Sequence, residues 1–286
     1  MANYRETHGG KVKTYEYDPD NPYVGQVWYN EELATIRVYK TTNSSAWATG
    51  GIMNTARVGG GSSGVSNTSA LVFGGELHPS TNTAVTESYD GSTWTEVGDT
   101  NTAAYSRGGA GTATAAIAYG GLVPGSPPST ATAETFNGTS WTEVGDLNQV
   151  KHSLGRAGIT GTAGLVMGGS LPPDTANVES WDGSSWTEIA NMNTARETLT
   201  GNGTSTLALA TGGSLNPGNS ALNEEWNGTS WTELADLGTA RYNIQGSTFN
   251  SSNTAAVVFG GLTSTALANT EEWTVPESIS NLTITD

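Results

Sequence analysis

One motif recurs along the chain at a nearly constant interval, and this recurrence restricts the fold more than any other feature. Its clearest copy is Val178–Arg196, which reads VESWDGSSWTEIANMNTAR. Related copies begin at Thr86, Ala133 and Asn223, and a truncated copy begins at Asn269. Between copies lies an apolar run closed by paired glycines, the second of which are Gly75, Gly121, Gly169, Gly213 and Gly261. The step between pairs, about 44–48 residues, is the period of a four-stranded propeller blade.

Each full repeat can be divided into four short strands. In the repeat around Gly120 we predict a first strand near Ala110, followed by Thr114–Tyr119, Ala133–Phe136 and Trp141–Val144. The second strand is apolar at consecutive residues, which is typical of a strand covered on both faces. The third and fourth strands are joined by Asp-Gly or Asn-Gly, a dipeptide that suits the positive-φ positions of a tight hairpin turn. An aromatic residue precedes each turn and a tryptophan follows it, so these side chains are expected to pack across the hairpin.

Counting the apolar runs that end in paired glycines gives five blades. Tryptophan follows the turn at Trp94, Trp141, Trp186 and Trp231. The last repeat contains Trp273 but no fourth strand, whereas the chain begins with an unmatched copy of that strand at Trp47. We therefore predict an all-β, five-bladed β-propeller of four-stranded blades. The ring would be closed by pairing of the N-terminal and C-terminal strands, with Trp47 beside Trp273, so that no sheet edge stays open.

The segments outside the repeat define the expected domain organisation. Residues 1–40 form an N-terminal arm and hairpin, residues 41–276 the propeller, and residues 277–286 a C-terminal tail. The hairpin is predicted from two alternating segments, Gly25–Asn30 and Ala34–Lys40, around a polar turn. No regular structure is predicted for Met1–Tyr23.

Composition excludes several classes of protein. The chain has no cysteine, so it has no disulfide, thiolate metal site or thiol nucleophile. A net charge of −16 with only 11 Lys and Arg argues against a nucleic-acid partner, because little is available to neutralise phosphates. No apolar run reaches membrane-spanning length, and the first residues lack the apolar segment of a conventional secretion signal.

The combination of features within each repeat resembles the kelch repeat over about Ser44–Val275. These features are the paired glycines, a glutamate two residues before an aromatic residue, a tryptophan about five residues later and an arginine ten residues beyond. The resemblance implies a binding scaffold. One kelch-like branch contains copper radical oxidases, which need a Cys–Tyr crosslink and a histidine-containing copper site. A chain without cysteine, whose three histidines are His8, His78 and His152, does not fit that branch.

A narrower resemblance concerns the amino-acid composition and the turn sequences of the blades. They are rich in Thr, Ser, Asn and Gly, carry NGTSWTE turns and are preceded by a GQVWYN hairpin. In these respects the chain is similar to kelch-like proteins encoded by marine tailed bacteriophages. That similarity implies a module carried on a tail, fibre or capsid.

Charged residues also recur in phase with the repeat. Two residues before the aromatic stand Glu87, Glu134, Glu179, Glu224 and Glu271, and ten residues after each tryptophan stand Arg57, Ala104, Lys151, Arg196 and Arg241. The cations lead into the innermost strands, so one interpretation is a site for an anion or an acidic sugar near the channel mouth. The other is Glu–Arg pairing between neighbouring blades. The second is favoured because isolated buried charges are unfavourable.

The loops after the second strand differ most between repeats, and in an up-and-down blade they emerge on the same face as the loops between blades. The connecting loops add Tyr105, His152 and Tyr242 to that face. Since loops on a rigid scaffold commonly carry binding sites, our candidate binding residues are Arg57, Tyr105, Lys151, His152, Arg196, Arg241 and Tyr242. Plain solvated loops are an equally good interpretation. No catalytic constellation and no metal-ligand cluster stands out.

We therefore expect a non-enzymatic virion structural protein of a tailed phage, assembled in the host cytoplasm. Its propeller would serve host-surface attachment or decoration through weak contacts multiplied over many copies. Expected partners are other virion proteins, through the N-terminal arm, and a host-surface glycan or protein. No cofactor, metal, nucleic acid or membrane insertion is expected. The alternatives are a glycan-active enzyme, such as a lyase or glycosidase, and an intracellular adaptor. The adaptor ranks last because no BTB-like partner domain accompanies the repeats.

Overall fold

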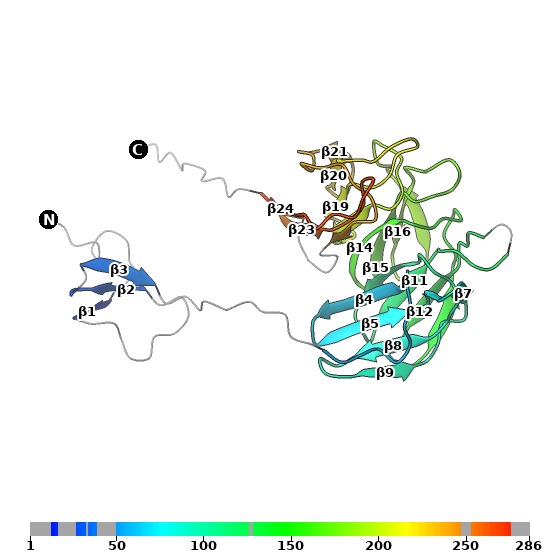
Figure 1. Ribbon diagram of the computed structural model, residues 1–286, viewed down its shortest axis with the longest axis horizontal. Coiled ribbons are helices and arrows are strands. Elements are labelled where there is room, and N and C mark those ends of the chain that lie inside the picture. Colours follow the sequence, from blue (N-terminus) through cyan, green and yellow to red (C-terminus); the bar gives the residue numbers. More distant parts are fainter. Residues whose placement is uncertain are drawn as a thin grey trace. The chain divides into compact units, whose positions relative to one another are not determined.

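The computed structural model of the chain describes residues 13–16, 27–32, 34–38, 50–125, 128–246 and 253–275. All regular secondary structure in these ranges is β-strand (Figure 1). The described part therefore contains no helix able to span a membrane. The chain divides into two compact units, Met1–Thr49 and Gly50–Asp286, which we describe separately.

The first unit contains a three-stranded sheet. Its strands, in spatial order, are β1 (Lys13–Tyr15), β2 (Val27–Asn30) and β3 (Thr35–Val38). The antiparallel pair β2–β3 confirms the predicted hairpin. The absence of regular structure predicted for Met1–Tyr23 is wrong at β1, which pairs with β2 in parallel. A parallel partner must come from a distant segment and is held by backbone bonds, so the three-residue segment Lys-Thr-Tyr gives no local signal for it.

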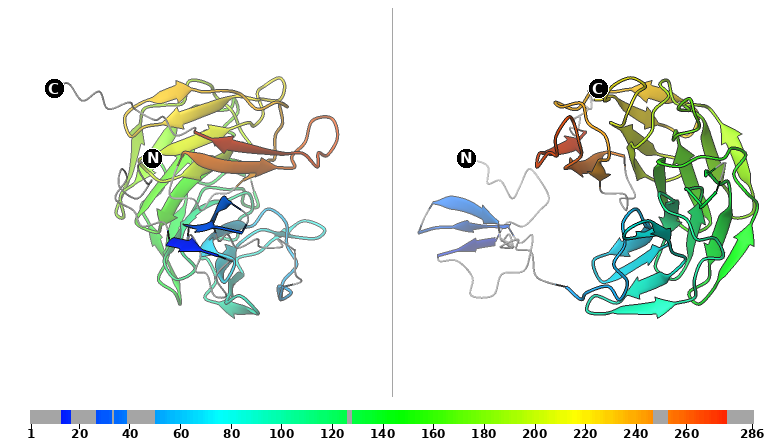
Figure 2. Two further views of the ribbon diagram at one scale, coloured as in Figure 1. Left: turned by 90° about the vertical axis from the view of Figure 1, so that its left-hand side faces the viewer. Right: turned by 45° about the vertical axis from the view of Figure 1, so that its right-hand side comes forward.

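The second unit is a five-bladed β-propeller, as predicted. Blade one consists of β4 (Gly61–Ser66), β5 (Ser69–Phe73), β8 (Thr86–Tyr89) and β9 (Trp94–Val97), and blade two of β10 (Gly108–Gly111), β11 (Ala116–Tyr119), β12 (Ala133–Phe136) and β13 (Trp141–Val144). Blade three consists of β14 (Gly155–Thr160), β15 (Ala163–Met167), β16 (Val178–Trp181) and β17 (Trp186–Ile189), and blade four of β18 (Thr200–Gly203), β19 (Ala208–Thr211), β20 (Asn223–Trp226) and β21 (Trp231–Glu233). A short pair, β6 (Glu76–Leu77) and β7 (Thr81–Asn82), extends a loop of blade one. Figure 2 shows the blades following one another in chain order. The first strands of neighbouring blades contact one another, which places them innermost.

The fifth blade has three strands in the described part of the chain: β22 (Gln245–Gly246), β23 (Ala255–Phe259) and β24 (Thr270–Thr274). Trp273 lies on β24, as predicted. The fourth strand predicted around Trp47 lies outside the residues that the structure describes. Closure of the ring by that strand therefore stays a prediction.

The hydrophobic core is divided among the junctions between blades. Three clusters of buried side chains join blade one to two, two to three and three to four. In each, the tryptophan after the turn packs against its own hairpin and against the preceding blade. Trp141, for example, lies 4.9 Å from the ring of Phe73 in blade one and 5.0 Å from Phe136 in its own blade. The recurring tryptophans thus hold successive blades together, and their packing across the hairpin is confirmed.

The hairpin turns differ in detail from the prediction. Phe136 pairs with Trp141, which leaves a four-residue loop, and within it glycine is the residue with positive φ (Gly138, 96°). Asn137 instead accepts hydrogen bonds at Oδ1 from the backbone N–H groups of Thr139 and Ser140, both at 3.0 Å. The Asp or Asn is therefore selected for its side-chain acceptor, which caps the loop, rather than for tolerance of positive φ.

Candidate functional site

The recurring glutamates and cations form a buried ion pair in every blade. The nitrogen–oxygen distances are 2.6 Å for Arg57–Glu87, 3.2 Å for Arg107–Glu134, 3.0 Å for Lys151–Glu179 and 2.8 Å for Arg196–Glu224, and the fifth pair is Arg241–Glu271. Both side chains are almost fully enclosed in the first four pairs, whereas Glu271 is 29% exposed. The four candidate cations named from the sequence therefore point into the protein interior.

The partner of Glu134 was missed by sequence reasoning. The repeat places Ala104 where the other blades have a cation, and Arg107, three residues further on, supplies the charge instead. Arg107 is also held by the carbonyl of Thr102, at 3.1 Å. Since Arg107 is the single cation on the loop into blade two, its charge was the available signal.

Each ion pair lies within one blade, and the expectation that it joins neighbouring blades is wrong in this respect. Arg196, on the loop leading into blade four, binds Glu224 and the carbonyls of Gly212 and Leu222, all in blade four. The backbone of the same residue makes the link between blades, because its carbonyl accepts a hydrogen bond from Gly169 N–H of blade three, at 3.0 Å. Glycine is required there: Gly168 and Gly169 have φ of 58° and 110°.

The glutamate also holds the incoming loop. Glu87 accepts hydrogen bonds from the backbone N–H groups of Asn54 and Thr55, at 2.7 and 3.1 Å. Burial alone would raise the pKa of Glu87, but these bonds and Arg57 outweigh it and lower the pKa below its ordinary value. Burial lowers the pKa of Lys151 and Arg196, and the partner carboxylates oppose that shift. The recurring charges thus hold each blade to the loop that leads into it.

A second set of equivalent positions lies on the face formed by the long loops. One residue in each connecting loop forms a β-bridge to the loop that follows the second strand of the blade; we call these five the rim residues: Val58, Tyr105, His152, Glu197 and Tyr242. The bridges agree with the prediction that these two kinds of loop share one face. Tyr105, His152 and Tyr242 are half-buried, and Val58 is 67% exposed. Val58 and Glu197 were not predicted, because they share a position with the others but no residue type.

The backbone beside the rim is strained in four blades. The residue after the rim residue has a φ of 51–53° although it is not glycine: Ser106, Ser153, Thr198 and Asn243. Each such conformation costs about 1 kcal/mol or more and persists where surrounding structure imposes it. Here hydrogen bonds between neighbouring blades do so, from Ser106 N–H to Gly59 and from Thr198 N–H to Ser153, at 2.7 and 2.6 Å. The rim is therefore a rigid platform.

Ionisable groups gather at the rim between blades three and four. Burial lowers the pKa of His152, and Glu197 acts in the opposite direction, so His152 is neutral near pH 7. Its Nδ1 lies 2.9 Å from Ser153 Oγ. Burial and the charge of Glu197 both raise the pKa of Asp174. No group of three or more His, Asp or Glu side chains suited to a metal ion occurs in the described ranges.

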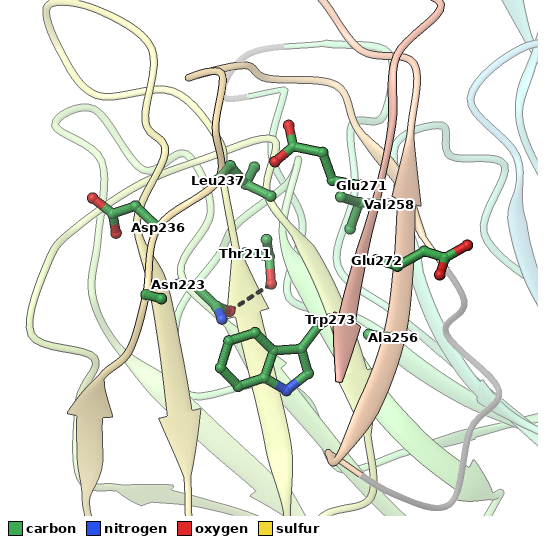
Figure 3. Close-up of a pocket in the computed structure, with 10 residues that line it drawn as sticks. Thr211, Asn223, Asp236, Leu237, Ala256, Val258, Glu271, Glu272 and Trp273 are labelled. Atoms are coloured by element: carbon green, nitrogen blue, oxygen red, sulfur yellow. Dashed lines mark hydrogen bonds between the residues drawn. The ribbon is translucent and has the colours of Figure 1, made fainter. Parts of the chain in front are cut away.

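Two cavities add to this picture. A groove of about 240 Å³ opens beside the rim of blade one and is lined by Arg57, Val58, His78 and neighbouring residues. A smaller cavity, of about 70 Å³, lies between blades four and five and is lined in part by Thr211, Asn223 and Trp273 (Figure 3). In the three preceding junctions, a tryptophan of the following blade packs against the positions equivalent to Thr211 and Asn223.

No protein-family profile matches the chain, and no curated protein matches it.

Proposed function

We propose that the chain is a non-enzymatic virion structural protein of a tailed phage, which displays its propeller for attachment to a host surface. The observation that carries this proposal is the contrast between the blade interior and the rim. Every blade repeats an ion pair between its recurring glutamate and a cation, whereas the five rim residues are of four different types on a nearly identical backbone. A constant scaffold with a variable, rigid, partly exposed face is the usual organisation of a binding module.

Two further features support the proposal. The sequence resembles kelch-like proteins of marine tailed phages, and the first unit, Met1–Thr49, contains a compact sheet of its own that would suit anchoring on other virion proteins. The groove beside Val58 and His78 offers a recess on the displayed face. Weak contacts there would be multiplied by the number of copies on a particle.

The test is binding of the fluorescently labelled full chain to a panel of marine bacterial cells and purified surface polysaccharides. We expect saturable binding without release of reducing ends. Changing Tyr105 and Tyr242 to Ala should weaken binding about tenfold or more, because aromatic anchors dominate such interfaces. Thr229→Ala, on an exposed hairpin turn, is the matched control and should bind like the wild type. Binding that is unchanged in the rim variant would place the site elsewhere.

A glycan-active enzyme is the second candidate, and one observation favours it. Burial and the charge of Glu197 raise the pKa of Asp174, which is the kind of environment that suits a proton donor. The recurring glutamates are engaged in ion pairs, so Glu→Gln changes there would test folding rather than catalysis. Reducing-end release from a bound polysaccharide that is abolished by Asp174→Asn would establish the enzyme, and its absence would leave the attachment role.

A further inference from the structure

One cation of the propeller departs from the pattern of the others. Residues 50–275 contain six Lys and Arg side chains. Five form the ion pairs with the recurring glutamates, and the sixth, Arg156, has no carboxylate within salt-bridge distance among the residues that the structure describes. Arg156 therefore carries a charge that the repeat does not neutralise.

Arg156 lies on the innermost strand of blade three, at a position that is otherwise small. The strand registers make it equivalent to Ser62, Gly109, Gly201 and Gly246 in the other four blades. We call these five residues the hub position. Arg156 reaches from blade three to blade one, where its Nη2 donates a hydrogen bond to Ser62 Oγ at 3.0 Å. One large cation thus extends among the innermost strands, where three of the blades have glycine.

The surroundings of Arg156 supply no negative charge. Burial lowers the pKa of Arg156, yet a guanidinium stays protonated at any ordinary pH. Burial also raises the pKa of the neighbouring Tyr119 well above its ordinary value, so that phenol is neutral. Apart from the bond to Ser62, no hydrogen bond of the guanidinium occurs within the described part of the chain. A half-buried cation without a carboxylate partner is stabilised by an anion that can reach it.

There is room for such an anion. A cavity of about 150 Å³ at the starts of the innermost strands of blades three to five is lined by Arg156, Thr200 and Gln245, together with Leu154, Leu199 and Ile244. This is several times the ~30 Å³ that a water molecule occupies in the liquid. The hydroxyl of Thr200 and the amide of Gln245 are hydrogen-bond donors for a second oxygen.

We infer that the hub position around Arg156 binds a small oxyanion or carboxylate, such as phosphate, sulfate or the carboxylate of an acidic sugar. The guanidinium contributes the charge and a fork of N–H donors, and Thr200 and Gln245 contribute neutral donors. This site is separate from the rim residues and does not depend on the proposed attachment function. If the chain binds anions but does not bind host cells, only the proposed attachment function is contradicted.

The inference is tested by isothermal titration calorimetry of the full chain at constant ionic strength. The probes are inorganic phosphate, glucuronate and, as the neutral counterpart, glucose. We expect one saturable site for phosphate or glucuronate and none for glucose. If only phosphate binds, the site takes free oxyanions; if glucuronate also binds, it accepts acidic sugars. An absence of saturable anion binding at millimolar concentrations would overturn the inference.

Variants assign the binding to Arg156. Arg156→Gln should weaken anion binding about tenfold or more, the loss expected for a charged hydrogen bond of about 1.5–3 kcal/mol. Arg156→Lys keeps the charge but loses the fork, so its affinity should lie between those of Arg156→Gln and the wild type. If Arg156→Gln does not fold, the comparison of anion affinity between Arg156→Lys and the wild type still tests the inference. Thr229→Ala is the control, and equal affinity in Arg156→Lys and the wild type would contradict a guanidinium site.

Discussion

The junction between blades three and four differs from the junction between blades four and five in what fills it. In the first, Trp231 of blade four shares a buried cluster with Met167 and Val178 of blade three. In the second, Thr211 and Asn223 occupy the equivalent positions, hydrogen-bonded to each other at 2.8 Å, and a cavity of about 70 Å³ lies beside them (Figure 3). The outermost strand of the following blade therefore supplies the tryptophan that fills each complete junction.

Blade five also differs from blade four in the burial of its ion pair and in its backbone hydrogen bonds. Its glutamate, Glu271, is 29% exposed, whereas Glu224 of blade four is 1% exposed. In blade four, Gly213 N–H donates to the carbonyl of Arg241 in the next blade, at 2.9 Å. The equivalent N–H of Gly261 donates no hydrogen bond within the described part of the chain. The contacts of a blade thus depend on the blade that follows it, and three predictions test this rule.

The largest effect is expected from the ion pairs. Arg196→Met leaves Glu224 charged and buried and removes the donors to the carbonyls of Gly212 and Leu222. We expect it to lower the free energy of unfolding by about 5 kcal/mol. Arg241→Met, in blade five, should cost about half of that, because water reaches Glu271. Denaturant unfolding measures both values.

The double variant Arg196→Met/Glu224→Leu is the control for this comparison. Replacing a whole buried pair by apolar side chains is often close to neutral, so the double variant should recover much of the loss. Equal losses for Arg196→Met and Arg241→Met would show that the two blades are held equally, and would contradict the rule.

The sequence predicts this architecture well wherever the signal is local and repeated. The third and fourth strands of blade two were predicted at Ala133–Phe136 and Trp141–Val144 and are found there. Turn residues, strand alternation and tryptophans recur in phase, so each copy confirms the others. The in-phase recurrence of glutamates and cations also predicts that they form ion pairs.

The features that the sequence did not predict depend on single residues that depart from the repeat. Arg107 replaces the cation missing at Ala104 from a position outside the repeat pattern, because its long side chain reaches the same site. Arg156 breaks a pattern of small residues that becomes visible only when the strand registers align the five innermost strands. The rim residues Val58 and Glu197 share a backbone position but no chemistry with their equivalents.

The second prediction concerns the tryptophan that blade five lacks in the described part of the chain. Trp186→Ala, in a complete junction, should lower the free energy of unfolding by about 3–5 kcal/mol through loss of buried area and a residual cavity. The sequence assigns the equivalent position in blade five to Trp47. We therefore expect Trp47→Ala to lower the stability of the propeller by about 3 kcal/mol.

The matched control for Trp47→Ala is Tyr29→Ala, which removes a 36% exposed aromatic residue of the first unit. It should leave the unfolding of the propeller unchanged. Calorimetry with near-ultraviolet circular dichroism distinguishes the two. A Trp47→Ala variant as stable as the wild type would mean that this tryptophan does not complete blade five.

The smallest effect is expected from the hairpin turns, and it tests whether a charged turn, which the described part of blade five does not contain, supports a blade. Hydrogen bonds from the backbone of Ser185 and from the side chain and backbone of Ser184 lower the pKa of Asp182 to about 2. An unfolded Asp has a pKa of about 3.9. A depressed native pKa stabilises the fold above the unfolded pKa, and this contribution is lost as the pH falls from about 4 to about 2.

Asp182→Asn converts the turn of blade three into the kind found in blade four, where Asn227 caps the loop with the same two backbone bonds. At pH 7 the melting temperature should therefore be unchanged. As the pH falls from about 4 to about 2, the melting temperature of the variant should decrease less than that of the wild type, because an amide does not titrate there. A marked destabilisation at pH 7 would mean that the charged turn itself supports the blade. The weaker interactions of blade five would then also reflect the lack of such a turn in its described part.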